Sequence, residues 1–436
     1  MRNIPVTKRK MNKILLSCTL MLTSVLGMAQ TTDSTQWRNV FTDPQLQGLI
    51  DSALLHNADL RSACLNVEQA QASLRAARLS FVPSLSIGAE GALNKAGNAA
   101  AVSTYNIPLT MQWELDLSGR LRGEKRAAVA EYWNTAMTEQ AVRLQIISAV
   151  TSCYYTLIMI DEQIEITRES IENAQHTVRV MEALKEVSMQ DEAAVSQAKA
   201  ALYNVQATEK SLVQQMMATE NAMCLLIGQR MDNIERNTGL TGLNVEMSDS
   251  YELSCLSERP DVMAAEYALK AQMAQVDVAQ SAFYPSLTIS AQAGWTNNIG
   301  EIVNPGQILL SAVTSLVQPL FNRGQNKANL QIARSREEQA LTTFNQTLLT
   351  AGTELSDALT ACRLSNERLE LRSEEVKAAE RAYEVSRELM QNSSSTYLEV
   401  LTAQSALLQS RLLMTTDRMD LIQGEINLFK ALGGKM

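Results

Sequence analysis

The 436-residue chain is poor in residues that interrupt regular structure, with only 18 glycines and 8 prolines. Few turns imply long elements, and the helix formers alanine, leucine, glutamine, glutamate and methionine dominate the composition. Disorder is disfavoured, because 46% of the residues are hydrophobic and can be buried, although only 5% are aromatic. We therefore expect a fold built mainly of long helices.

Basic stripes and reaction motifs are lacking as well. The formal net charge is −9, and the body of the chain carries no run of cations, which argues against nucleic-acid binding. No phosphate-binding loop or cofactor signature is present. His56 and His176 are the two histidines, and neither belongs to a Ser/His/Asp or metal-ligand spacing. We predict that the protein is not an enzyme and uses no cofactor or metal.

The first 29 residues have the features of a signal peptide. They carry five basic residues and no acid, so their removal would change the net charge to −14 (−9 − 5). The apolar run 14–27 follows Lys13, and small residues precede Gln30. We predict cleavage after Ala29. The sequence also leaves open a lipoprotein cleavage before Cys18.

Sulfur-containing residues give no framework for a disulfide or a metal site. The five later cysteines are odd in number, widely spaced and without a C-x-x-C motif, so we interpret them as small buried hydrophobes. They are Cys64, Cys153, Cys224, Cys255 and Cys362. The 20 methionines allow an interpretation as copper or silver export, but methionine also commonly fills helical cores.

An internal repeat spans about 200 residues. Residues 81–87 (FVPSLSI) are echoed by 283–289 (FYPSLTI), and 195–202 align with 400–407. Asparagine and glycine collect between the two copies. The predicted organisation is a first structural repeat, a linker and a second structural repeat, at 30–230, 231–256 and 257–436.

Each repeat is predicted to contain a helix, two strands, a long helix and a short helix. In the first repeat these are 44–80, 83–94, 104–117, 118–187 and 193–228. In the second repeat they are 260–282, 285–296, 307–320, 324–391 and 396–432. Apolar residues recur every seventh position from Leu341 to Met390, which indicates a coiled coil. A helix of about 70 residues is a rod of roughly 100 Å, and two short helices would stack end to end beside it.

The strands alternate apolar and polar residues, except for 307–320, whose faces are mixed. Strands of roughly ten residues with one apolar and one polar face suit a membrane β-barrel with a wet interior, and a soluble sandwich is the alternative. Trp113, Trp295 and Tyr105 are candidates for interfacial aromatics. Lipid tolerates no open sheet edge, and four strands cannot close a barrel, so several chains must share one. No later run of apolar residues is long enough to predict a membrane-spanning helix.

Several motifs occur in the order typical of one known family. They are D-P-x-L-x-x-L-I at 43–50, W-E-L-D-L-S-G-R at 113–120, L-L-I-G-Q at 225–229, E-R-P-D-V at 258–262, F-Y-P-S-L at 283–287 and K-A-L-G-G at 430–434. With them, nearly the whole chain after residue 29 resembles the TolC-type outer-membrane efflux protein family, in the branch of NodT-like outer-membrane factor lipoproteins.

This resemblance implies a homotrimer in the outer membrane of a Gram-negative bacterium. Long coiled-coil helices would form a large periplasmic α-barrel, and four strands per chain would contribute to a shared twelve-stranded β-barrel in the lipid. The function implied is a passive exit duct of a tripartite efflux or secretion system, docked to a periplasmic adaptor and an inner-membrane pump. The alternatives are a periplasmic coiled-coil adaptor or scaffold, and an autonomous outer-membrane enzyme or porin.

The resemblance also assigns candidate functional residues at the two helix hairpins opposite the strands. The periplasmic tip candidates are Ser188, Met189, Gln190, Asn392, Ser393, Ser394 and Ser395. The gate candidates are Glu399, Thr402, Asp191 and Glu192. Glu399 matches the first of two gate carboxylates in the family, whereas Thr402 stands at the second, so one ring of charge is missing. The alternative interpretation of the tip residues is that they are ordinary solvated helix caps.

Overall fold

The structure is a computed structural model that describes residues 37–95, 97, 101–188, 190–230, 234–237, 239–240, 243, 254–299, 302–391 and 397–435. The predicted signal peptide, Cys18 and most of the predicted linker lie outside the described residues. Those features therefore stay predictions.

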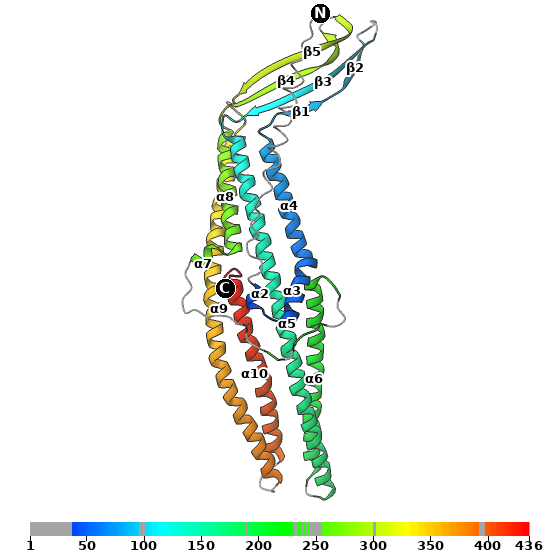
Figure 1. The fold of residues 1–436 in the computed structure, drawn as a ribbon, viewed down its shortest axis with the longest axis vertical. Helices are drawn as coiled ribbons and strands as arrows, with labels where there is room; N and C mark the ends of the chain where they lie inside the picture. The colour runs from blue at the N-terminus through cyan, green and yellow to red at the C-terminus, as the bar shows by residue number, and fades with distance from the viewer. Residues whose placement is uncertain are drawn as a thin grey trace, which may run out of the picture.

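The molecule is a long helical rod with a β-sheet at one end (Figure 1). The helices are α2 (Trp37–Val40), α3 (Pro44–His56), α4 (Ala58–Leu79), α5 (Arg120–Glu186), α6 (Glu192–Ile227), α7 (Ser254–Ser257), α8 (Pro260–Ser281), α9 (Gln325–Gln391) and α10 (Tyr397–Ala431). The two longest, α5 and α9, have 67 residues each and are therefore about 100 Å long. The predicted mainly α fold with long helices is confirmed.

The helices form a row rather than a closed bundle. Near the sheet, α5 packs between α4 and α8, and α8 packs against α9. Toward the tips, α5 packs between α6 and α10, and α10 packs against α9 (Figure 1). Two short helices thus stack end to end beside each long one, as their lengths predict. The row ends on one side with α4 and α6, and on the other with α9.

A break at Asn57 corrects the predicted helix 44–80. Asn57 ends α3 and caps α4, because its Oδ1 accepts hydrogen bonds from the backbone N–H groups of Asp59 (2.9 Å) and Leu60 (3.1 Å). Its Nδ2 donates to the carbonyl of Leu226 (2.8 Å), the penultimate residue of α6. Gly228 then turns the chain with φ +71°, and a Cβ there would lie 2.5 Å from the His56 carbonyl oxygen. This junction seats the end of α6 against the α3–α4 break.

The second repeat has a corresponding junction built from charges. Arg259 is only 3% exposed and donates to the carbonyl of Ala431 (3.3 Å) near the end of α10. Its guanidinium also pairs with Asp261 (2.7 Å) and with Glu354 of α9 (2.6 Å). Gly433, with φ +71°, follows α10 as Gly228 follows α6. The end of α10 is thereby fixed against the start of α8.

The sheet is antiparallel, with strand order β1–β3–β4–β5 and with β2 also paired to β3. The strands are β1 (Ser84–Ile87), β2 (Glu90–Asn94), β3 (Val102–Leu115), β4 (Ser286–Ile299) and β5 (Ile302–Val317). The predicted strand 83–94 is therefore two strands, which are interrupted at Gly88 and Ala89. Each strand lies next to the helix to which it is joined, so the strands and helices follow the same order across the row.

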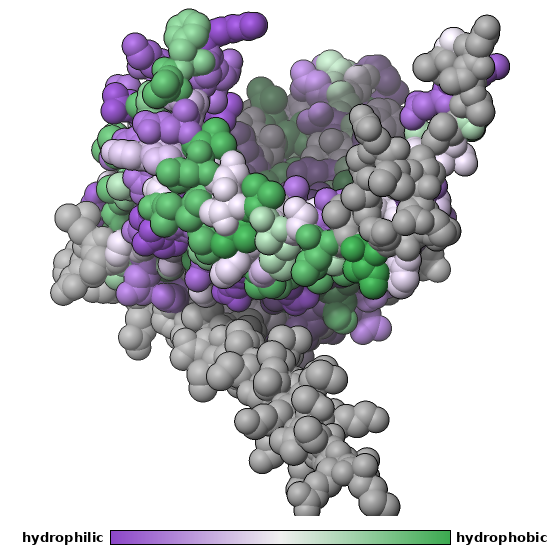
Figure 2. All heavy atoms as spheres, turned by 90° about the horizontal axis from the view of Figure 1, so that it is seen from above, coloured by the Kyte–Doolittle hydropathy of each residue, from purple (hydrophilic) through white to green (hydrophobic). Residues whose placement is uncertain are grey.

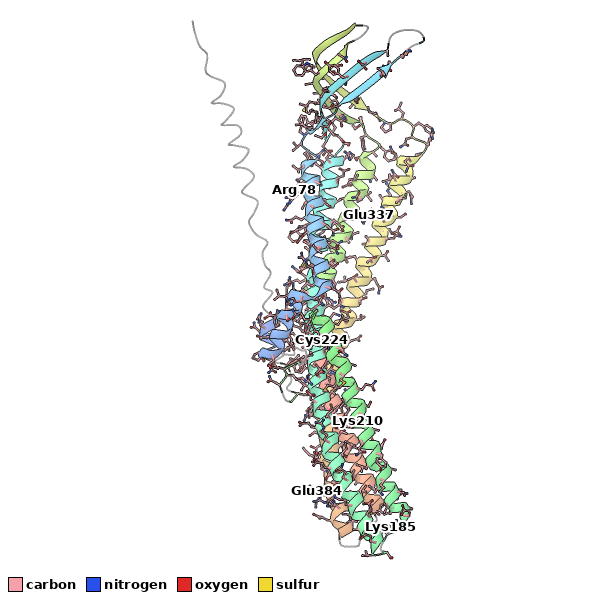
Figure 3. The ribbon with its side chains drawn as sticks, turned by 90° about the vertical axis from the view of Figure 1, so that its right-hand side faces the viewer. Arg78, Lys185, Lys210, Cys224, Glu337 and Glu384 are labelled. Atoms are coloured by element: carbon pink, nitrogen blue, oxygen red, sulfur yellow. The ribbon has the colours of Figure 1, made fainter. Side chains whose placement is uncertain are left out.

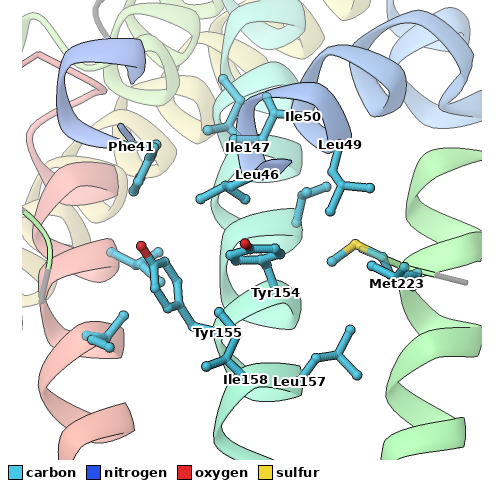
Figure 4. Packing of buried hydrophobic residues seen from close by; sticks show 14 of the residues in the cluster. Phe41, Leu46, Leu49, Ile50, Ile147, Tyr154, Tyr155, Leu157, Ile158 and Met223 are labelled. Carbon is cyan, nitrogen blue, oxygen red and sulfur yellow. The ribbon is translucent and has the colours of Figure 1, made fainter. Parts of the chain in front are cut away.

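The main apolar core lies about halfway along the rod, where the ends of the short helices meet α5 (Figure 1), and Figure 4 shows its packing. Tyr154 of α5 is fully buried, and its hydroxyl donates to Asp43 (2.5 Å). Burial, reinforced by the Asp43 carboxylate, raises the pKa of Tyr154. Among the described residues, α5 is the one helix long and apolar enough to cross a membrane, but 56% of that apolar window is buried in the protein. It therefore reads as a core helix.

The five described cysteines are free, with Cys362 buried and the other four half-buried. Cys362 packs where α9 meets Gly424 of α10. A Cβ added at Gly424 would lie 3.1 Å from the Cys362 sulfur. Burial raises the pKa of Cys362 to about 11, with a smaller contribution from Glu425. The predicted burial therefore holds for Cys362, whereas the other four are only partly buried.

Candidate aperture and duct wall

One face of the sheet is mainly apolar, because the strand register places apolar residues opposite one another in most rows. Leu109 faces Ala293, and Ile107 faces Trp295, which in turn faces Ile308. Several of these side chains are highly exposed, including Ile87 (77%), Ile308 (71%) and Leu310 (80%). A band of hydrophobic residues is visible at this end of the molecule (Figure 2). An apolar surface of this extent needs a cover that is not water.

The opposite face of the sheet is mostly polar. Thr110 faces Gln292, which faces Ser311, and Glu114 faces Thr288. The register also assigns β5, whose faces the sequence pattern left mixed. Its residues Ser311 and Ser315 lie on the polar face, which is interrupted by apolar residues such as Val313 and Val317.

Aromatic residues mark the two ends of the apolar face. Tyr105 and Trp113 are eight residues apart on β3, or about 27 Å along the strand. Trp295 lies near the Tyr105 end, opposite Ile107, and is 56% exposed. At the other end, the indole of Trp113 donates to the carbonyl of Phe81 (3.0 Å). This spacing matches the aromatic girdles that flank the lipid-exposed band of membrane barrels.

At the first tip, the acidic gate candidates are held within their own hairpin. Asp191 is the N-cap of α6 and accepts from the backbone N–H of Ala194 (2.9 Å). Glu192 forms an ion pair with Lys185 at the end of α5, and this pair lowers the pKa of Glu192. Ser188 turns the chain in a left-handed conformation (φ 59°) that glycine usually adopts. The turn is therefore stabilised locally, and Met189 lies outside the described residues.

At the second tip, the structure places Glu399 and Thr402 in the first turns of α10. Both are exposed, and the Thr402 hydroxyl donates to the carbonyl of Leu398 (2.8 Å) within the same helix. Asn392, Ser393, Ser394 and Ser395 lie outside the described residues. The two gate candidates are thus about one helical turn apart, and Thr402 brings no charge.

Polar contacts that the sequence interpretation missed tie the two hairpins together. The hydroxyl of Tyr397 donates to Gln197 Oε1 (2.5 Å), which links α10 to α6. Farther from the tip, Arg411 of α10 pairs with Glu169 of α5 (2.9 Å) and Glu380 of α9 (2.8 Å). The Gln163 amide of α5 donates to the Thr415 hydroxyl (2.9 Å) of α10. In the sequence, this last contact could have been suspected from the polar Gln163, which stands next to Ile164 of the apolar series on α5.

The edge helix α9 keeps apolar side chains exposed. Leu355 and Cys362 of the heptad series are buried, whereas Leu341 and Leu348 are 46% and 37% exposed. A second pair of leucines, Leu364 and Leu371, is 48% and 74% exposed. Each lies two residues after a position of the heptad series, which places it about 200° around the helix from that series. The side of α9 turned away from α10 therefore offers leucines to a further partner.

The sequence and structure match known proteins along almost their whole length. The family profile described as outer membrane efflux protein matches two separate segments of the chain, residues 49–229 and 254–434. A probable outer membrane lipoprotein, SilC of Salmonella typhimurium, is 29% identical over 409 residues, covering 92% of this chain and 88% of the relative. The cation efflux system protein CusC of Escherichia coli K12 is 27% identical over 416 residues, covering 94% of this chain and 91% of the relative.

Solved structures agree. A crystal structure of CusC superposes with a TM-score of 0.84 at 27% identity, covering 94% of this chain and 96% of that one. The outer membrane protein VceC of Vibrio cholerae gives a TM-score of 0.84 at 26% identity, covering 92% and 99%. Together with the apolar sheet face and the 67-residue helices, these matches show that the chain belongs to the outer membrane efflux protein family and is an outer-membrane protein of the TolC type.

Proposed function

We propose that this chain is the passive exit duct of a tripartite efflux or secretion system and works as a homotrimer. The observation that carries the proposal is that both the helix row and the sheet end in open edges. β5 and the β1–β2 side are the sheet edges, and α9 and the α4–α6 side are the helix edges. β1 and β2 pair one after the other along the same edge of β3, so each chain supplies four positions across the sheet. Three copies placed edge to edge would then form one twelve-stranded barrel above one helical barrel.

Physical chemistry supports closure by further copies. An open sheet edge in lipid leaves backbone N–H and C=O groups unpaired, at several kcal/mol per group. The exposed leucines of α9 would gain apolar partners on the neighbouring chain. The polar face of the sheet would then line the duct, and the apolar face would contact lipid. The periplasmic adaptor alternative accounts for neither the apolar sheet face nor the family.

The partners of the trimer would be a periplasmic adaptor and an inner-membrane pump. Relatives carry the names cation efflux system protein and toluene efflux pump outer membrane protein, so members of this family serve systems with chemically different cargo. A wide, polar duct suits such variety, because its wall need not recognise the cargo. The pump would supply the energy and the two helix tips would meet the adaptor.

The gate of the duct would be at the second tip, with Glu399 as its charged ring. Threefold symmetry places three copies of Glu399 around one axis, and rings of acidic side chains favour cations in pores. Thr402 adds no charge, and Glu399 is the acid that the family resemblance places at the first gate position. Glu399 is therefore the strongest candidate for setting ion preference.

Planar-bilayer recordings of the purified full-length protein test both proposals. Wild type is expected to conduct, to prefer cations and to be blocked by a trivalent cation. Glu399→Ala is expected to lose most of the block and part of the preference, whereas Glu374→Ala, an exposed α9 acid paired with Lys377, should change neither. Unchanged block in Glu399→Ala would place the constriction elsewhere, and a complete absence of channels in the wild type would contradict the duct itself.

A further inference from the structure

A depression of about 1170 Å³ lies directly below the sheet, between α4, α5 and α8. Five cations line it: Arg78, Arg122, Lys125, Arg126 and Lys270. Asp277 is the one carboxylate of the lining, so the lining carries a net charge of +4 (5 − 1). The whole chain has 47 acidic and 38 basic residues, so this local excess of positive charge opposes the charge of the molecule.

Part of this charge is compensated. Arg126 pairs with Asp277 (2.9 Å), Arg122 with Asp116 (2.8 Å), and Lys270 with Glu266 (2.6 Å). Counting Asp116 and Glu266 as well, the region keeps a net charge of +2 (5 − 3).

Two cations remain available. Within the described part of the chain, Arg78 and Lys125 have no ion-pair partner, and both are exposed. Arg78 points away from the helices just below the sheet (Figure 3). These two side chains can therefore meet an anion without first breaking an ion pair.

The depression also has an aromatic wall at the end away from the sheet. The rings of Trp133 and Tyr267 stack with centroids 6.1 Å apart, and the Lys270 ammonium lies 4.8 Å from the centre of the Tyr267 ring. At the end near the sheet, Phe81 joins the lining. The site thus combines cations with apolar surface, which suits an anionic amphiphile better than a small hydrated anion.

Hydrogen bonds show which side of the wall carries this depression. On the polar face of the sheet, Glu114 pairs with Arg120 (2.6 Å), which also pairs with Glu124. Arg122 and Arg126 are each two residues from Glu124, about 200° around α5, and so lie on the opposite side.

The apolar face leads to the depression instead. Trp113 on that face donates to the carbonyl of Phe81, which lines the depression. The depression therefore continues the lipid-facing side of the sheet onto the outside of the helical barrel.

We propose that this depression binds the phosphate headgroup of an anionic phospholipid in the periplasmic leaflet of the outer membrane. Arg122 and Arg126 lie within about 10 Å of the start of α5, at the depth of a headgroup layer below the apolar sheet face. The acyl chains would cover that face, and Arg78 and Lys125 would contact the phosphate. The site would fix the height of the barrel in the membrane.

Native mass spectrometry of the full trimer in detergent tests this proposal, with dioleoylphosphatidylglycerol and dioleoylphosphatidylcholine as probes. Wild type should bind phosphatidylglycerol about tenfold more tightly than phosphatidylcholine. The double variant Arg78→Gln, Lys125→Gln should weaken phosphatidylglycerol binding by about 30-fold and leave phosphatidylcholine binding unchanged. The matched control is Arg334→Gln, Arg336→Gln, which removes two exposed arginines of α9 that do not line the depression and should change binding less than twofold.

Equal binding of the two lipids to wild type, or undiminished binding to the double variant, would overturn the proposal. Complete displacement of phosphatidylglycerol by excess inorganic phosphate would overturn it in favour of a free-anion site. A protein that forms no trimer would contradict the proposed duct, whereas a trimer without lipid preference would contradict this site alone.

Discussion

The two 67-residue helices α5 and α9 occupy the same place in the two repeats but are buried to very different extents. The middle of α5 is packed from both sides, and Val150, Tyr154, Leu157 and Ile160 are fully buried there. On α9, small residues such as Ala351 and Ala358 are buried, while Leu371 is 74% exposed. The same kind of element is thus a core helix in one repeat and an edge helix in the other.

The difference follows from position in the row. α5 has α4 and α6 on one side and α8 and α10 on the other, whereas α9 packs against α8 and α10. A duplicated chain with its two repeats side by side necessarily leaves one long helix at the margin. On the proposed function, the exposed side of α9 would serve assembly rather than the fold of a single chain.

The junction beside α5 should be the more sensitive of the two junctions to added volume. At Gly228 a Cβ would lie 2.5 Å from the His56 carbonyl oxygen, whereas at Gly433 the closest atom would be at 3.4 Å. Both residues have φ +71°. Gly228→Ala should therefore lower the melting midpoint of the detergent-solubilised protein by about 10 °C, and Gly433→Ala by less than half as much.

The control for these variants is Gly324→Ala, which has a left-handed φ of +82° but no atom within 4 Å of the added Cβ. It isolates the cost of the backbone conformation. Equal losses in all three variants would show that the close approach at Gly228 does not matter. Differential scanning fluorimetry is sufficient for the comparison.

The junction beside α9 should be the more sensitive to salt. Arg259→Gln removes a buried guanidinium and leaves Asp261 and Glu354, which are 41% and 44% exposed and can be rehydrated. We expect the melting midpoint to fall by about 5 °C at low ionic strength, with a smaller loss in high salt because wild type is then screened. Asn57→Ala removes uncharged hydrogen bonds, so it should lower the melting midpoint by the same amount at both salt concentrations. A salt-independent effect of Arg259→Gln would contradict the ionic character of this junction.

The smallest effect is expected from Glu425, which lies in α10 between the two long helices. Burial raises the pKa of Glu425, although its carboxylate accepts from the backbone N–H of Leu243 (3.0 Å). The folded protein therefore holds a proton more tightly than the unfolded chain, and stability falls as pH rises from the ordinary glutamate range through the raised pKa. Glu425→Gln keeps an acceptor for Leu243 and should raise the melting midpoint at pH 7, by an amount that vanishes toward pH 4.

Glu258→Gln provides the opposite case. This exposed acid pairs with Lys435 (2.7 Å), and the pair lowers the pKa of Glu258. Its substitution should give no increase at pH 7. An increase in Glu258→Gln equal to that in Glu425→Gln would show that net charge, rather than burial, is responsible.

The sequence predicted the long helices well because their heptad pattern is local. Leu355 and Cys362 of the α9 series are buried as expected, and α9 spans Gln325–Gln391 where 324–391 was predicted. The break at Asn57 was missed because the helical pattern continues across it. At the break, the Asn57 side chain caps α4 and also donates to the carbonyl of Leu226, 169 residues away. The faces of β5 likewise required its register against β4, because the strand carries apolar residues on both sides.

The candidate site was less accessible to sequence reasoning, for a physical reason. Asp191 and Glu192 resemble free acids in the sequence, but they serve as a helix cap and an ion-pair partner in the fold. An aperture on a threefold axis is made by several chains. One chain therefore gives the depth of Glu399 and Thr402 along α10, but it does not give their distance from the axis. Their role as a gate stays a prediction.

The mass of the complex in detergent tests the edge-helix account most directly. Size-exclusion chromatography with light scattering should give three copies for wild type. The variant Leu364→Asp, Leu371→Asp, altered on the side of α9 away from α10, should give single chains with the helical content of wild type. A monomeric wild type, or a variant that stays trimeric, would contradict the claim that α9 is exposed in order to meet a neighbouring chain.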